Sequence, residues 1–120
     1  MKTTALANCS HIEMSLIIEA MTMHSYSLSG FEKKLFDLDL DKVRSRKKKV
    51  ELDGCGLKQI AIALRRKGIT IHRLYGNKRY VEERKKCFNL AIDIDLIRIK
   101  FQQENGPKVK AQTAATVHAS

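Results

Sequence analysis

Three acidic residues spaced two apart are the first feature of the sequence that could carry chemistry. Asp37, Asp39 and Asp41 have the D-x-D-x-D order with which a calcium-binding loop begins. Such a loop needs glycine at its sixth position and glutamate at its twelfth, where this chain has Lys42 and Lys48. Three carboxylates could also hold magnesium in a nuclease, but no further acidic cluster lies at a diagnostic spacing. We therefore expect charged surface or pairing with basic residues, and no metal site.

Histidine and cysteine show no arrangement typical of a catalytic site. The four histidines are scattered, and none belongs to a recognisable nucleophile motif. The three cysteines lack C-x-x-C spacing, which argues against a zinc module or a disulfide framework and favours a reducing cytoplasm. No apolar run is long enough for a signal sequence or a membrane span. We expect no enzyme, no cofactor and no membrane partner.

Basic residues are the strongest candidates for a functional role, and they are concentrated in one part of the chain. The net charge is +10 and the pI about 9.7, which favours an anionic partner. Between residues 42 and 86 there are 16 Lys or Arg and 4 Asp or Glu, so all of the positive excess lies there. The candidate nucleic-acid-binding residues are Arg44, Arg46, Lys47, Lys48, Lys49, Lys58, Gln59, Arg65, Arg66, Lys67, Arg73, Lys78 and Arg79.

The elements that must position these residues are predicted from a change of period at Gly68. Apolar residues recur with helical spacing before this glycine, so we expect a helix over 57–67 that Gly68 closes. Residues 69–75 alternate in a β-branched run, which predicts a strand. Gly76-Asn77 would form a two-residue hairpin turn, and residues 78–81 would be the returning strand. A helix followed by a short basic hairpin is the core of a winged helix.

Two more helices are expected before this core. The segment 11–23 has helical apolar spacing, and we expect it to cover the core. Ser29 and Glu32 match a capping box, which predicts a second helix running towards Val50. A glycine-rich turn at 52–56 would then give helix-turn-helix geometry. In it, the basic run at 42–49 would hold phosphates, and the 57–67 helix would read bases with Lys58, Gln59, Arg65 and Arg66.

The end of the chain leaves two alternatives open. Residues 82–103 fit one long helix, or a helix that gives way to a strand. Their apolar surface suggests self-association, although completion of the monomer's own core fits equally well. We expect the segments 1–10 and 105–120 to be mobile ends.

Two short strings resemble known DNA-binding proteins. GLKQIAIALRRKGITIHR resembles the helix-turn-helix segment near the end of serine recombinases and related mobile-element regulators, and HRLYGNKRYVEE resembles the wing of excisionase-like winged helices. The resemblance covers about a quarter of the chain, shares no catalytic residues and implies DNA binding without strand transfer. In recombinase-type segments the 57–67 string would be the supporting helix, so its role as supporting or recognition helix stays open.

Together these patterns predict a mainly α fold with a small β-hairpin, that is, a winged helix-turn-helix-like single domain. The expected parts are an N-terminal segment with a short helix over 1–28, a DNA-binding core over 29–81, a dimerisation element over 82–104 that is a helix or a strand, and a tail over 105–120. The expected function is sequence-specific binding of double-stranded DNA by a dimeric, cytoplasmic transcriptional regulator. The alternative is a basic RNA-binding or ribosome-associated factor, or a protein-interaction subunit.

Overall fold

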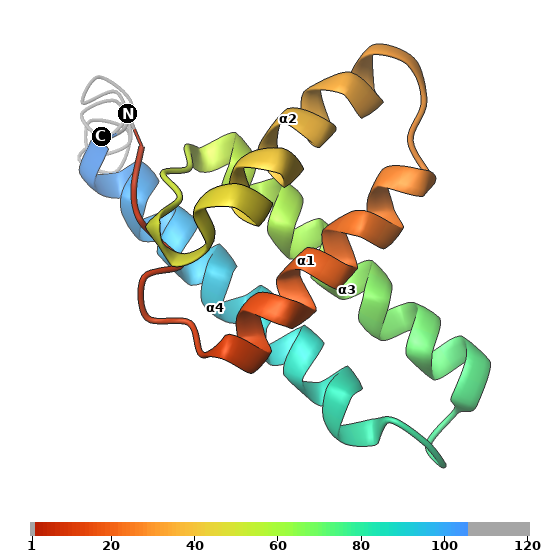
Figure 1. Cartoon of the computed structure of the whole chain (residues 1–120). Coiled ribbons are helices and arrows are strands. Elements are labelled where there is room, and N and C mark those ends of the chain that lie inside the picture. The colour runs from red at the N-terminus through yellow and green to blue at the C-terminus, as the bar shows by residue number, and fades with distance from the viewer. Residues whose placement is uncertain (1, 106–120) are drawn as a thin grey trace, which may run out of the picture.

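Four α-helices make up almost all of the computed structural model, which describes residues 2–105 (Figure 1). The element order is α1 (His11–Tyr26), α2 (Gly30–Arg46), the 3-10 helix η1 (Lys47–Lys49), α3 (Gly54–Tyr75) and α4 (Val81–Asn105). The described residues contain no β-strand, and their one β-bridge is an isolated antiparallel pair, Thr3 and Leu52. Residues 2–105 are therefore helical without a sheet, and the predicted fold, mainly α with a small β-hairpin in a winged arrangement, is wrong.

The helices α3 and α4 form an antiparallel hairpin that is the framework of the molecule. α1 crosses α3, and α2 packs on α1, so α3 is the central helix of an elongated body of 52 × 31 × 31 Å (Figure 1). Along α3 the row Leu57, Ala61, Leu64, Gly68 and Ile71 alternates steps of four and three residues, and all five are buried. This spacing keeps one face of a helix against its neighbour over many turns.

The predicted wing does not form, because Gly68 lies inside α3 and does not end it. A Cβ at Gly68 would lie only 2.8 Å from Phe88 Cζ of α4, so this glycine allows the two helices to approach closely. The helix continues for seven more residues and ends before Gly76, whose φ of +59° suits a glycine. The predicted strands over 69–75 and 78–81 are thus the end of α3 and part of the turn into α4.

The predicted start of α2 is correct, but the predicted capping box at this start is not present. α2 begins at Gly30 as expected, but its N-cap residue Ser29 makes no side-chain capping hydrogen bond. A complete capping box exists instead at Ser10 and Glu13, where Ser10 Oγ accepts from Glu13 N and the Glu13 carboxylate accepts from Ser10 N. The predicted glycine-rich turn is shorter than expected, since Asp53 caps α3 and the helix already begins at Gly54.

The two ends of the chain also differ from expectation. Residues 2–10 are tied to the body, because Leu6 is fully buried and the backbones of Thr3 and Leu52 exchange two hydrogen bonds. For residues 82–103 the single-helix alternative is correct, as α4 is continuous over this range. Of the predicted tail, residues 106–120 lie outside the described part of the chain.

Candidate nucleic-acid interface

The densest group of predicted binding residues lies at the end of α2 and in η1. We call Arg44, Arg46, Lys47, Lys48 and Lys49 the α2–η1 cluster, and all five are exposed. Within residues 2–105, none of them forms an ion pair with a carboxylate. All five side chains are therefore open to solvent and free of carboxylate partners within the described residues.

The backbone on both sides fixes this cluster in place. Lys47 has a φ of +52°, which turns the chain sharply out of α2. Val50 follows fully buried, and Leu52 pairs with Thr3. Arg44 Nη2 donates a hydrogen bond of 2.8 Å to Thr22 Oγ1 of α1. The charges therefore sit on a short, anchored segment.

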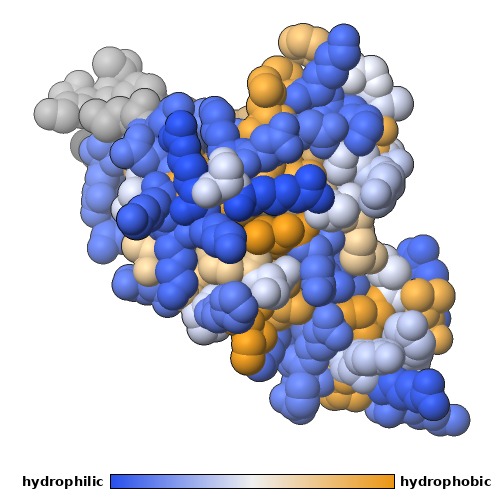
Figure 2. Space-filling model, in the orientation of Figure 1, coloured by the Kyte–Doolittle hydropathy of each residue, from blue (hydrophilic) through white to orange (hydrophobic). Residues whose placement is uncertain are grey.

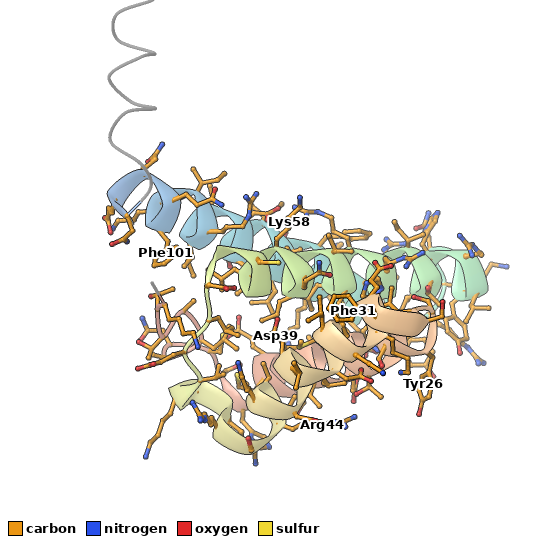
Figure 3. All side chains as sticks on the ribbon, turned by 90° about the horizontal axis from the view of Figure 1, so that it is seen from above. Tyr26, Phe31, Asp39, Arg44, Lys58 and Phe101 are labelled. Carbon is orange, nitrogen blue, oxygen red and sulfur yellow. The ribbon has the colours of Figure 1, made fainter. Side chains whose placement is uncertain are left out.

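The predicted base-reading residues do not share one open face of α3. Figure 3 shows Lys58 on the α4 side of the molecule and Arg44 on the α2 side. Gln59 is half-buried between α3 and α2, beside Phe36 and Asp39. Both α1 and α4 pack against α3. The predicted wing is absent from residues 2–105, while the role of α3 as recognition or supporting helix stays a prediction.

Arg65 points towards α4 and forms an ion pair with Asp95, to which Arg98 Nε also lies 3.4 Å away. Burial alone would raise the pKa of Asp95, but the hydrogen bonds and charges of the two arginines outweigh it and lower that pKa below its usual value. Arg65 thus joins α3 to α4.

Lys67 has a structural position that the sequence did not reveal. Its side chain is 10% exposed, and its Nζ lies 3.4 Å from Glu19 of α1 and 3.6 Å from Glu83 of α4. One ammonium group therefore links three helices, and its charge is already paired with two carboxylates.

Arg66 and Arg73 line a cleft between α1 and α3 with a volume of about 380 Å³. Arg66 Nη1 lies 3.2 Å from His24 Nδ1 and donates to Ser27 Oγ at 3.2 Å. Burial lowers the pKa of His24 below its usual value, and the Arg66 charge adds to this effect. His24 and Ser27 carried no signal in the sequence, since single polar residues in an apolar helix have no diagnostic spacing.

Lys78 and Arg79 lie in the turn between α3 and α4, next to two aromatic rings. Tyr75 and Tyr80 contact each other edge to face, with ring centroids 4.7 Å apart. Arg84 Nη1 holds the turn by donating to Asn77 Oδ1 at 2.8 Å. The turn and the α2–η1 cluster occupy opposite ends of the elongated body (Figure 1), and hydrophilic surface covers much of both ends in Figure 2.

The three aspartates of α2 do not converge. Asp37 pairs with Lys33 at 3.3 Å and accepts a hydrogen bond from Ser25, Asp39 is half-buried, and Asp41 is exposed. Burial raises the pKa of Asp39. In the part of the chain that the structure describes, no group of three His, Cys, Asp or Glu side chains could hold a metal ion.

The chain matches no protein-family model, no curated protein and no solved structure. The local resemblance to recombinase and excisionase segments thus stays a prediction, although the wing that it implied is absent from residues 2–105. None of the described helices has an apolar stretch sufficient to cross a membrane.

Proposed function

We propose that this protein binds double-stranded DNA and acts as a regulator, and that the α2–η1 cluster holds the phosphate backbone. The observation that carries the proposal is the exposure of five anchored positive charges within six residues, with no described carboxylate pairing with them. Lys and Arg side chains of this kind displace the counterions that surround DNA, which drives binding. Backbone contacts position a protein without reading sequence, so specificity must come from other contacts or from DNA shape.

A dimer would give such a protein two copies of the cluster. On α4, the residues Ile92, Leu96 and Ile99 form an exposed apolar row at helical spacing. Asp93 and Lys100 flank this row and are both exposed. If two α4 helices pack antiparallel about a two-fold axis between residues 96 and 97, Asp93 of each copy lies opposite Lys100 of the other. We propose this pairing as the dimer interface.

The DNA proposal is tested by comparing affinities for duplexes and RNA. The best genomic duplex should bind tighter than a random duplex by about 4 kcal/mol or more, as specific binders do. Lys47→Ala/Lys48→Ala should weaken binding to both duplexes by at least about tenfold at 0.1 M salt. The matched control Lys34→Ala/Lys86→Ala removes two exposed charges that are not among the predicted binding residues and should change little. Equal affinity for random duplex, genomic duplex and single-stranded RNA would contradict the proposal that this protein is a DNA-binding regulator.

The dimer proposal is tested by charge exchange. Asp93→Lys or Lys100→Asp alone should place like charges together and shift sedimentation towards the 13.7 kDa chain mass. The combined exchange restores opposite charges and should restore the dimer. A wild-type protein that sediments as a monomer at micromolar concentration, or single and double variants that behave alike, would rule this interface out.

A further inference from the structure

We propose that the cleft between α1 and α3 binds the phosphate group of a nucleotide, with Arg66 and Arg73 as its phosphate ligands. This site is separate from the α2–η1 cluster, so it does not depend on the DNA proposal above. Its walls come from the second half of α1, from Ser27, and from α3 between Ala63 and Arg73. Figure 2 shows the surface hollowed between the part that carries the α1–α2 connection and the end of α3.

The charge of the cleft is the first argument. Three cationic residues line it and no carboxylate does. Lys67 is neutralised by Glu19 and Glu83, which leaves Arg66 and Arg73. In residues 2–105 neither of these arginines has an ion-pair partner. Positive charge in a concave site concentrates the local field, because the low-dielectric walls screen it poorly.

The placement of the two arginines is the second argument. They are seven residues apart on α3, which puts both side chains on one face, two turns from each other. Arg66 is oriented by Ser27 Oγ and by the ring of His24, so its planar group is held before a ligand arrives. A guanidinium can donate two parallel hydrogen bonds to phosphate oxygens. Thr70, between the two arginines on the same wall, adds a hydroxyl.

The remaining lining suggests what accompanies the phosphate. Met23 and Ile69 are exposed apolar side chains on opposite walls, and Ala20 and Ala63 form small apolar surfaces between them. A volume of about 380 Å³ lies in the range of small-molecule sites. An apolar surface beside two guanidinium groups fits the flat base and the phosphate of a nucleotide. The phosphate can belong to a free mononucleotide or to a nucleic-acid strand.

Titration followed by NMR tests the site, with the His24 ring as reporter. Adenosine monophosphate should shift the His24 signals saturably, whereas adenosine should bind at least about tenfold more weakly, because it lacks the charge-assisted hydrogen bonds. A bound phosphate should also raise the pKa of His24, which burial and Arg66 now lower. Equal binding of adenosine and its monophosphate, or no saturable shift at millimolar monophosphate, would overturn the inference.

Variants separate this site from the DNA-binding cluster. Arg73→Gln removes an exposed side chain and should weaken adenosine monophosphate binding by about tenfold or more while the fold is kept. Arg66→Gln should do the same, and circular dichroism checks that its lost contacts to α1 leave the helices intact. The control Arg46→Gln removes one exposed charge of the α2–η1 cluster and should leave nucleotide binding unchanged while DNA binding weakens. If Arg46→Gln and Arg73→Gln weaken nucleotide binding equally, the binding is non-specific and the inference is wrong.

A last comparison identifies the source of the phosphate. An oligonucleotide without terminal phosphates presents only phosphodiesters, whereas the mononucleotide presents a monoester. If the oligonucleotide shifts His24 at the lower concentration and Arg73→Gln removes that shift, the cleft holds a nucleic-acid strand. If the mononucleotide is the tighter ligand, the cleft is an effector site. Either result supports a phosphate site at Arg66 and Arg73.

Discussion

Replacing Lys67 by methionine should cost less stability than removing its two acidic partners. The Lys67 side chain is 10% exposed, while the Glu19 and Glu83 side chains are 59% and 35% exposed. In Lys67→Met the carboxylates can turn to water, and the methionine fills the space of the lysine stem. In Glu19→Gln/Glu83→Gln the ammonium stays enclosed without a counter-charge, which is the costly way to break a buried pair.

The expected losses of stability follow from how exposed the Lys67, Glu19 and Glu83 side chains are. Removing one partner of a fully buried pair costs about 3–5 kcal/mol, and the partial exposure of Glu83 and Glu19 reduces this to about 2 kcal/mol for the double variant. Lys67→Met should cost about 1 kcal/mol or less, since no buried charge is left unpaired. Urea denaturation of the three proteins at pH 7 measures both values, provided that the m-values agree. A Lys67→Met variant that loses as much stability as the double variant would refute this reasoning, and so would a Lys67→Met variant that loses DNA affinity.

Three further predictions concern titration, thiol reactivity and capping. The pKa of His24 is lowered in the folded state, so on acidification the unfolded chain takes up the His24 proton at a higher pH than the folded chain does. The free energy of unfolding should therefore be highest above the unfolded pKa of about 6.5 and should fall as the pH drops below 6.5. In His24→Gln the urea midpoint should change less over this pH range. A thiol reagent at pH 8 should modify one cysteine in the folded protein, the exposed Cys55, since burial raises the pKa of Cys87 to about 11; rapid modification of Cys87 would contradict the packing. Ser10→Ala should cost about 1 kcal/mol in thermal or urea unfolding, and Ser29→Ala should cost almost nothing, because of these two serines Ser10 makes a side-chain capping hydrogen bond and Ser29 makes none.

The helical pattern at the start of α3 was readable in the sequence, but its end was not. The row Leu57, Ala61, Leu64 continues at helical spacing through Gly68 to Ile71. Glycine at one point of this row looks like an interruption, because glycine disfavours helices by about 1 kcal/mol relative to alanine. Its reason for being there is a contact with Phe88, twenty residues further along, which no local pattern contains. Tertiary packing thus overrides the local preference for a strand after Gly68.

For the long C-terminal helix, the sequence left two alternatives open, one continuous helix or a helix followed by a strand, and could not decide between them. Cys87, Leu90 and Ile94 face the core at steps of three and four residues, while Ile92 and Ile99 face solvent. A helix that is apolar on two sides has almost no directional signal, and its alternating residues also suit a strand. Pairing with α3 in an antiparallel hairpin decides the matter, and that pairing is a property of both segments together.

The candidate site was predictable in its composition and not in its arrangement. The exposed run at 44–49 stands out from charge alone, since five cations in six residues cannot all be buried or paired nearby. Arg65, Arg66 and Lys67 follow one another in the sequence, so charge alone treats them alike. On a helix they point in three directions, towards α4, the cleft, and the carboxylates of Glu19 and Glu83. Which role each one takes depends on the helices around α3.

The salt dependence of DNA binding tests the central claim most directly. If the five residues of the α2–η1 cluster each contact a phosphate, the logarithm of the association constant should fall with the logarithm of salt concentration at a slope of about −4.5 for each bound protomer, or about −9 for the proposed dimer. Lys47→Ala/Lys48→Ala should reduce the steepness by about 2 for each protomer, and Lys34→Ala/Lys86→Ala should keep the wild-type slope. Equal slopes for wild type and Lys47→Ala/Lys48→Ala would show that the cluster does not hold the DNA backbone.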